Sequence, residues 1–167
     1  AWEFVWVGTA NIQCVVPRPG NGYCDVPGSA AEADIAWLDE AGATVGCRPG
    51  RYCVDSPATR GEVASMAWRL TGAPSPARDA PFVDVYASDH FATAVDWLWS
   101  EDLTTGTSAT TFSPDRPLTG AELLALLIRL ETHPDARATN RSGGEPPASS
   151  AIVTRAELAS VLRWWVD

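Results

Sequence analysis

The sequence of 167 residues contains no lysine, so all 12 of its basic residues are arginines. It also contains 21 acidic residues, which give a formal net charge of -9 at pH 7. An acidic chain repels the phosphate backbone of nucleic acids, and no basic cluster in the sequence offsets this repulsion. Nucleic acid is therefore not an expected partner.

Long apolar runs and common catalytic motifs are missing as well. No run approaches the roughly 20 residues that span a bilayer, so membrane insertion is not expected. The first residues, AWEFVWVG, have neither a basic leader nor a small-residue cleavage site, and we expect a mature secreted form or a piece of a longer protein. The motifs G-x-S-x-G and H-E-x-x-H are absent, so the sequence predicts no enzyme and no cofactor.

Spacings typical of metal sites are not found either. The four cysteines all lie in the first third of the chain, at Cys14, Cys24, Cys47 and Cys53. Their spacing is unlike that of zinc sites, so we expect no metal. Three disulfide pairings are formally possible, and reduced thiols are the alternative to all of them. We favour Cys14–Cys24 and Cys47–Cys53, because each closes a loop rich in proline and glycine, and disulfides indicate an extracellular compartment.

The sequence does contain repeats. Residues 34–70 align with residues 93–130, so that Trp37 matches Trp97 and Gly46 matches Gly106 at a shift of 60. Residues 153–165 repeat only the second half of this pattern. The sequence thus predicts an N-terminal arm (1–22) and a domain (23–167), which consists of unit one (23–72), unit two (82–131), a polar loop (132–150) and a partial unit three (151–167).

Each full unit is expected to form helix, loop and helix. The first helices have apolar residues at spacings of three and four, namely Ile35 and Leu38 in one unit and Phe91, Val95 and Leu98 in the other. The second helices have three equivalent apolar stripes, made of Val63, Met66, Ala67 and Leu70, of Leu123, Leu126, Leu127 and Leu130, and of Leu158, Val161, Leu162 and Trp165. Burial of the three stripes against one another predicts a mainly α-helical bundle around a pseudo-threefold axis.

Each second helix begins with the same pair of polar residues. The pairs are Thr59 and Glu62, Thr119 and Glu122, and Thr154 and Glu157. A threonine followed three residues later by glutamate is typical of a capping box, which stabilises a helix by roughly 1 kcal/mol. We therefore interpret these residues as structural.

Capping does not require the arginines at Arg60 and Arg155. A cation at the first helical position is mildly disfavoured by the helix dipole, so another role is indicated. A planar guanidinium there is able to bind a carboxylate or a pair of sugar hydroxyls. The alternative, which the residues leave open, is a surface arginine paired with a nearby aspartate.

These motifs resemble a known family. FVDV (82–85), the stretch 94–130 and the repeated helix starts TRGE, TGAE and TRAE are similar to S-layer homology modules of bacterial surface proteins. Residues 46–65 resemble the cysteine-containing form from high-GC bacteria. The resemblance covers about residues 23–130 and returns at 151–165. It implies a pseudo-trimer of helix–loop–helix units, here with the third unit truncated, at the extracellular cell surface. Grooves between units would bind secondary cell-wall polysaccharide, often acidic through pyruvate groups, without catalysis.

The resemblance also implies which residues bind this ligand. They are Arg60, Arg155, Trp97, Trp37, Gly106, Thr107 and Ser108. Packing in the core is the alternative for the tryptophans. Unit two has Gly120 at the arginine position and unit three lacks its first helix. These departures favour an alternative function, a self-assembling surface-layer or filament subunit that uses the fold as a scaffold.

The N-terminal arm has the alternation of a strand. Trp2, Phe4 and Trp6 would lie on one side of it. We expect this β-like arm to fold back on residues 163–167 or to add to a neighbouring copy of the chain. In the polar loop, Asn140 begins a sequon that matters only in a host that glycosylates such sites.

Overall fold

The computed structural model describes residues 22–133 and 152–166. Over these residues it is helical, without strands, which confirms the predicted mainly α fold class. The helices are α1 (Glu32–Glu40), α2 (Arg60–Leu70), α3 (Ala92–Ser100), α4 (Gly120–Thr132) and α5 (Arg155–Val166). None of them is long and apolar enough to cross a membrane. The strand predicted around Trp2, Phe4 and Trp6, and also Asn140, lie outside the described residues.

The second helices begin at the repeated Thr-x-x-Glu. At α2, the Glu62 backbone N–H donates to the Thr59 hydroxyl at 3.3 Å, and the Thr59 N–H donates to the Glu62 carboxylate at 3.1 Å. Thr119 and Glu122 form the same capping box at α4. At α5 the Thr154 N–H donates to Glu157, whose own N–H donates to Thr154. All three helices therefore start with the same local geometry.

The three segments that precede these helices meet in a ring of backbone hydrogen bonds. The Ala58 N–H donates to the Val153 carbonyl at 2.8 Å, the Val153 N–H donates to the Leu118 carbonyl at 3.0 Å, and the Leu118 N–H donates to the Ala58 carbonyl at 2.9 Å. These residues are equivalent in the repeat. The closed ring marks the pseudo-threefold axis.

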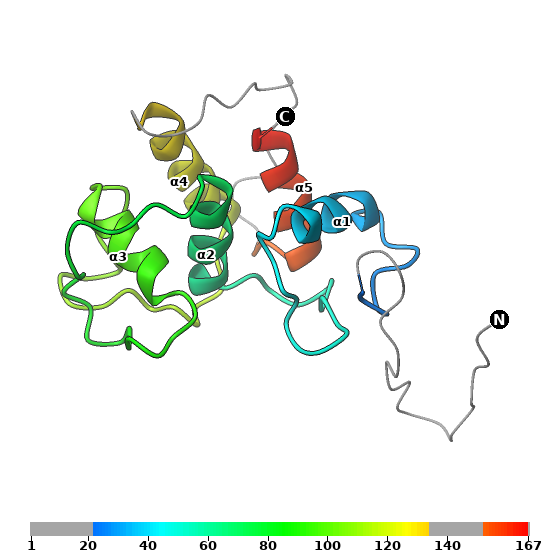
Figure 1. The fold of residues 1–167 in the computed structure, drawn as a ribbon, viewed down its shortest axis with the longest axis horizontal. Coiled ribbons are helices and arrows are strands. Elements are labelled where there is room, and N and C mark those ends of the chain that lie inside the picture. Colours follow the sequence, from blue (N-terminus) through cyan, green and yellow to red (C-terminus); the bar gives the residue numbers. More distant parts are fainter. Residues whose placement is uncertain (1–21, 134–151, 167) are drawn as a thin grey trace.

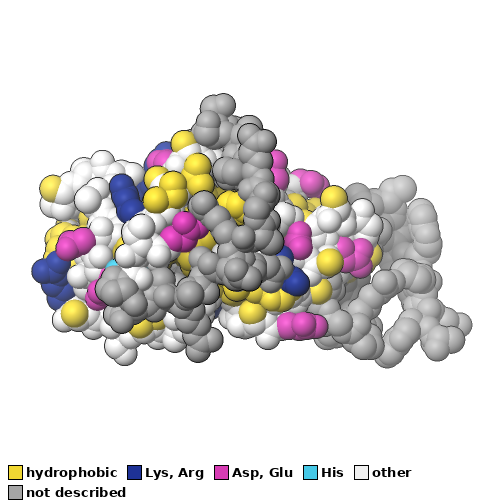
Figure 2. Space-filling view, turned by 90° about the horizontal axis from the view of Figure 1, so that it is seen from above, with side chains coloured by type: hydrophobic (Ala, Val, Ile, Leu, Met, Phe, Trp, Pro, Cys, Tyr) yellow, Lys and Arg dark blue, Asp and Glu magenta, His cyan; other side chains and the backbone are white. Residues whose placement is uncertain are grey.

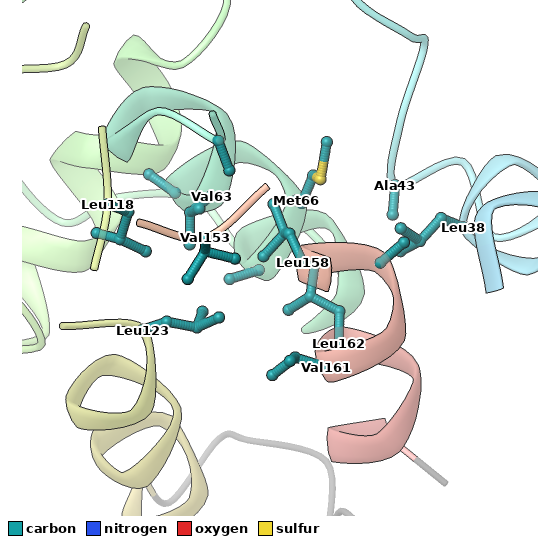
Figure 3. Packing of buried hydrophobic residues seen from close by; sticks show 14 of the residues in the cluster. Leu38, Ala43, Val63, Met66, Leu118, Leu123, Val153, Leu158, Val161 and Leu162 are labelled. Carbon is teal, nitrogen blue, oxygen red and sulfur yellow. The ribbon is translucent and has the colours of Figure 1, made fainter. Parts of the chain in front are cut away.

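A single hydrophobic core surrounds this axis. Figure 3 shows Val63 of α2, Leu123 of α4 and Leu158 of α5 directed toward one another, together with Leu118 and Val153. The three apolar stripes predicted for the second helices all contribute to this core. Leu70 and Leu126 are the two predicted members that are only partly buried.

The first helices pack on a neighbouring unit. α3 of unit two lies against α2 of unit one, and α1 of unit one lies against α5 of unit three (Figure 1). Each full unit therefore covers the second helix of the unit that precedes it around the axis. This exchange of helices ties the units into one body.

The loops between helices are closed by equivalent contacts. The Asp25 carboxylate accepts hydrogen bonds from the N–H groups of Tyr52 and Cys53 at 2.8 and 2.7 Å. Cys47 and Cys53 form a disulfide in the same loop. Cys24 is also disulfide-bonded, but Cys14 lies outside the described residues, so its pairing with Cys24 stays a prediction.

Candidate ligand groove

Arg60 of unit one reaches into the loop of unit two. Its Nε donates to the Phe112 carbonyl at 2.9 Å, and its guanidinium lies 4.6 Å from the centroid of the Phe112 ring. A terminal nitrogen lies 3.8 Å from the Glu122 carboxylate, and the side chain is 12% exposed. Arg60 is thus held in a fixed orientation and still reaches solvent.

Arg155 of unit three makes the same contacts with unit one. Its Nε donates to the Tyr52 carbonyl at 2.6 Å, and its guanidinium lies 4.7 Å from the centroid of the Tyr52 ring. It also forms an ion pair with Glu62, and only 2% of its side chain is exposed. Burial raises the pKa of Tyr52 to about 12, and Glu62 adds to this rise while Arg155 opposes it. Arg155 is therefore an interior residue that joins unit three to unit one.

This pattern gives a physical reason for Gly120. The arginine of each unit enters the loop of the next unit around the axis, so an arginine at position 120 would need a loop in unit three. The sequence of unit three does not repeat that loop. An arginine at position 120 would have the equivalent carboxylate, Glu157, but residues 134–151 contain no Tyr or Phe that could take the part of Tyr52 or Phe112. The loss of the arginine is therefore consistent with the loss of the loop sequence.

A groove of about 220 Å³ lies between unit one and unit two. Its polar lining consists of Arg60, Thr104, Thr105, Gly106, Glu122 and Arg129. Phe112 and aliphatic side chains such as Leu98 and Leu126 supply the apolar part. Arg129 donates to the Leu103 carbonyl at 3.1 Å, which fixes α4 against the loop of its own unit.

The charges beside this groove are mostly positive. Glu122 is 3.8 Å from Arg60 and also forms an ion pair with Arg116. Burial alone would raise the pKa of Glu122, but hydrogen bonds from Arg116 and from Thr119 outweigh it and lower the pKa. Burial lowers the pKa of Arg60, as does Arg116, yet arginine stays charged at neutral pH. Arg60 and Arg116 thus share Glu122, and Asp84 is a second anion that acts on Arg60. The Arg60 guanidinium still reaches solvent, where it is able to bind an anionic ligand.

Gly106 shapes the edge of the groove. Its φ is +75°, and a Cβ at this position would lie 2.5 Å from the Thr111 carbonyl oxygen. The adjacent hydroxyls bond within the loop: Thr107 Oγ1 lies 2.7 Å from Ser113 Oγ, and Ser108 Oγ lies 2.6 Å from Thr111 Oγ1. Thr107 and Ser108 are exposed and do not line the groove.

The two tryptophans lie away from the groove. Trp97 is 4% exposed, and its ring centroid is 6.0 Å from that of His133. Trp37 is half-buried, with the Arg163 guanidinium 5.0 Å from its ring centroid. The burial of Trp97 agrees with the alternative that this tryptophan packs in the core. Of the seven residues that the resemblance implied, the groove brings together only Arg60 and Gly106.

The sequence interpretation missed several residues of the groove. Glu122 was assigned only to capping, and Thr104, Thr105 and Arg129 were not selected. Arg129 had a detectable signal, because it matches Arg69 at the same repeat shift of 60. Arg69 donates to the Ala43 carbonyl in unit one as Arg129 donates to Leu103 in unit two. Across residues 22–133 and 152–166, no group of three or more His, Cys, Asp or Glu is arranged to hold a metal ion.

Part of the chain is similar to known proteins. Residues 81–124 match the family model of the S-layer homology domain, which confirms the resemblance for unit two. The chain is also similar to the middle cell wall protein of Brevibacillus brevis, with 30% identity over 102 residues. This match covers 59% of the chain but only 10% of the relative, so the chain corresponds to a small part of that protein.

Proposed function

We propose that this protein is a non-catalytic, extracellular protein of the bacterial cell surface that binds an acidic cell-wall polysaccharide in the groove between units one and two. The observation that carries the proposal is the convergence of Arg60, Glu122 and Gly106 in one solvent-accessible groove. The S-layer homology match and the cell wall relative support the same assignment.

The groove has the groups that an acidic sugar requires. A carboxylate, such as that of a pyruvate group, would take its place beside Arg60, which Glu122 and the Phe112 carbonyl already hold in position. Charge-assisted hydrogen bonds to a fixed guanidinium are stronger than those to neutral donors. Because Arg155 is buried, we assign polysaccharide binding to Arg60 and a structural role to Arg155.

The test is co-sedimentation with purified cell wall, before and after chemical removal of its polysaccharide. We expect retention only by the intact wall. Thr105→Glu adds a negative charge to the exposed edge of the groove and should weaken retention of an acidic polymer. Ala109→Glu adds the same charge to an exposed loop position that does not line the groove, and should leave retention unchanged. Equal retention by treated and untreated walls would rule out polysaccharide binding.

Arginine variants provide a second comparison. Arg60→Gln removes the proposed ligand-binding cation, whereas Arg78→Gln removes a cation that is 55% exposed and lies over Trp99. We expect a loss of binding only in Arg60→Gln, with thermal unfolding measured for both. If Arg60→Gln binds like the unaltered protein, the cation does not contribute to recognition.

A self-assembling surface-layer or filament subunit is the second candidate. The aromatic pattern of Trp2, Phe4 and Trp6 favours it, because aromatic anchors contribute much of the affinity of protein contacts. Light scattering on the intact chain and on a form without residues 1–8 tests it. Assembly that is lost on deletion while helicity is retained would support this candidate, and a monomeric intact chain would exclude it.

A further inference from the structure

The capping glutamates of α2 and α4 each lie at a junction between two units. One carboxylate oxygen of each, Oε2, belongs to the capping box, because it accepts a hydrogen bond from the backbone N–H of Thr59 in the case of Glu62 and of Thr119 in the case of Glu122. The other oxygen, Oε1, binds an arginine at each junction. Each capping glutamate therefore has one oxygen left for a guanidinium.

The two junctions give this oxygen to different arginines. At the junction of units three and one, Arg155 donates to Oε1 of Glu62. At the groove between units one and two, the donor to Oε1 of Glu122 is Arg116, and Nη1 of Arg60 stays 3.8 Å from the same oxygen. In the described part of the chain, the terminal nitrogens of Arg60 make no hydrogen bond, since only its Nε donates. They are therefore available to a ligand.

The repeat explains this exchange of partners. Arg116 and Ser56 are equivalent at the shift of 60, and both are exposed. Their backbones make the same contact, because the Arg116 carbonyl accepts from the Arg60 N–H at 3.1 Å and the Ser56 carbonyl accepts from the Arg155 N–H at 2.8 Å. The side chains differ. Serine supplies no cation, and at that junction the capping glutamate pairs with the arginine of the neighbouring unit.

The overall charge of the chain does not favour an acidic ligand. The net charge is -9, and Figure 2 shows arginine and acidic side chains dispersed over one face of the described residues, without a large patch of either sign. Attraction of an anion therefore depends on local contacts. The two arginines agree with this, since the side chain of Arg155, paired with Glu62, is 2% exposed and that of Arg60 is 12% exposed.

We propose that Arg116 is a positioning residue of the ligand groove, which binds the free oxygen of Glu122 and so keeps the terminal nitrogens of Arg60 available to an acidic ligand. Without Arg116, the Glu122 carboxylate would form with Arg60 the ion pair that Glu62 forms with Arg155. Arg116 itself does not line the groove. The ligand rests on the proposed function, whereas the exchange of partners on Glu122 does not.

A double-mutant cycle tests the exchange of partners without any ligand. Arg60→Gln and Glu122→Gln are made singly and together, once with Arg116 present and once with Arg116→Ser, which copies the serine of unit one. Urea unfolding at neutral pH gives the coupling between Arg60 and Glu122 in each background. Expressed as a ratio of unfolding equilibrium constants, the coupling should be about fivefold or more larger with Arg116→Ser. Equal coupling in the two backgrounds would overturn the proposal.

Retention by intact cell wall measures the consequence for binding. Arg116→Ser should weaken affinity about fivefold or more, and Arg116→Lys should largely preserve it, since lysine also supplies a cation for Glu122. Arg116→Ser/Glu122→Gln should bind like Glu122→Gln alone, because the competing carboxylate is then neutral. Arg116→Ser/Asp115→Asn is the matched control, since it makes the same change in net charge at an exposed residue outside the groove, and it should bind as weakly as Arg116→Ser.

The outcomes keep the two proposals apart. If the wall does not retain the unaltered chain, the proposed function fails and the double-mutant cycle alone decides the role of Arg116. If the unaltered chain binds but Arg116→Ser binds equally well, the positioning role is overturned. It is also overturned if Glu122→Gln does not restore binding to Arg116→Ser, because Arg116 would then contact the ligand directly. Equal restoration by Asp115→Asn would show that net charge, and not the position of Glu122, sets the affinity.

Discussion

Thr107 Oγ1 lies 2.7 Å from Ser113 Oγ, at the two positions where unit one has the Cys47–Cys53 disulfide. Ser113 and Cys53 also share a left-handed backbone, with φ of 57° and 62°. The Asp84 carboxylate accepts hydrogen bonds from Phe112 and Ser113 as Asp25 does from Tyr52 and Cys53. Unit two therefore closes with a hydrogen bond the loop that unit one closes with a covalent bond.

The double variant Thr107→Cys/Ser113→Cys should form a disulfide without rearrangement of the loop. Closure of so short a loop is expected to stabilise the fold by about 2 kcal/mol. Urea unfolding of the oxidised and the reduced double variant measures the gain, with Thr107→Cys alone as the control. Failure to form the bond, or equal midpoints in both redox states, would contradict the equivalence of the two loops.

Much of the fold was predictable because the sequence repeats. Helix starts, apolar stripes and turn residues each predict structure only weakly when they occur once. Here all three recur in register from unit to unit, and together they indicate one architecture. The contact between Cys47 and Cys53 was predictable for a similar reason, since a short Pro/Gly-rich loop lies between them. The partner of each arginine was not predictable, because a repeat does not show whether a side chain contacts its own unit or the next.

Burial also distinguishes residues that the sequence makes equivalent. Arg60 and Arg155 occupy the same repeat position, but Arg155 is almost completely enclosed and Arg60 is not. The position of Trp97 in the repeat is compatible with a core residue and with a ligand-binding residue. In the structure its ring packs against His133, as expected for a core residue. Such differences depend on which segments meet in three dimensions, and no local pattern contains that information.

Arg155→Met should destabilise the fold strongly. The substitution leaves Glu62 without its partner and the Tyr52 carbonyl without its donor. Loss of one member of a buried ion pair costs 3–5 kcal/mol when both are fully buried, and we expect about 2–4 kcal/mol here because Glu62 is partly exposed. Arg78→Met, at an exposed site, should change stability by less than about 0.5 kcal/mol. Similar urea midpoints for the two variants would show that Arg155 does not hold unit three in place.

Gly106→Ala should be more destabilising than Gly42→Ala. Both glycines have positive φ, but a Cβ at Gly106 would meet the carbonyl oxygens of Thr111 and Ser108 at 2.5 and 2.8 Å. A Cβ at Gly42 has no atom within 4 Å. We expect about 1 kcal/mol of backbone strain for Gly42→Ala, and a further loss for Gly106→Ala. Thermal unfolding of both variants measures the difference, and a smaller effect at Gly106 would argue against the tight loop.

The contacts of Glu122 should make the junction between units one and two sensitive to acid. Its pKa is lower in the folded state than in the unfolded state, so the ionised carboxylate stabilises the fold above the unfolded value of about 4.3. This contribution is lost as the pH falls through the lower, folded pKa. Glu122→Gln should therefore reduce the loss of stability between neutral and acidic pH. An unchanged pH dependence of the urea midpoint would place the acid sensitivity elsewhere.

Nuclear magnetic resonance titration with soluble fragments of an acidic cell-wall polysaccharide tests the central claim most directly. If the groove binds this ligand, the amide signals that shift should cluster at Arg60, Thr104, Thr105, Gly106 and Glu122, with signals around Tyr52 and Arg155 unchanged. The same fragments without their acidic groups should cause much smaller shifts. The absence of saturable shifts, or shifts that cluster around Arg155 and Trp37 instead, would contradict the assignment of polysaccharide binding to the groove between units one and two.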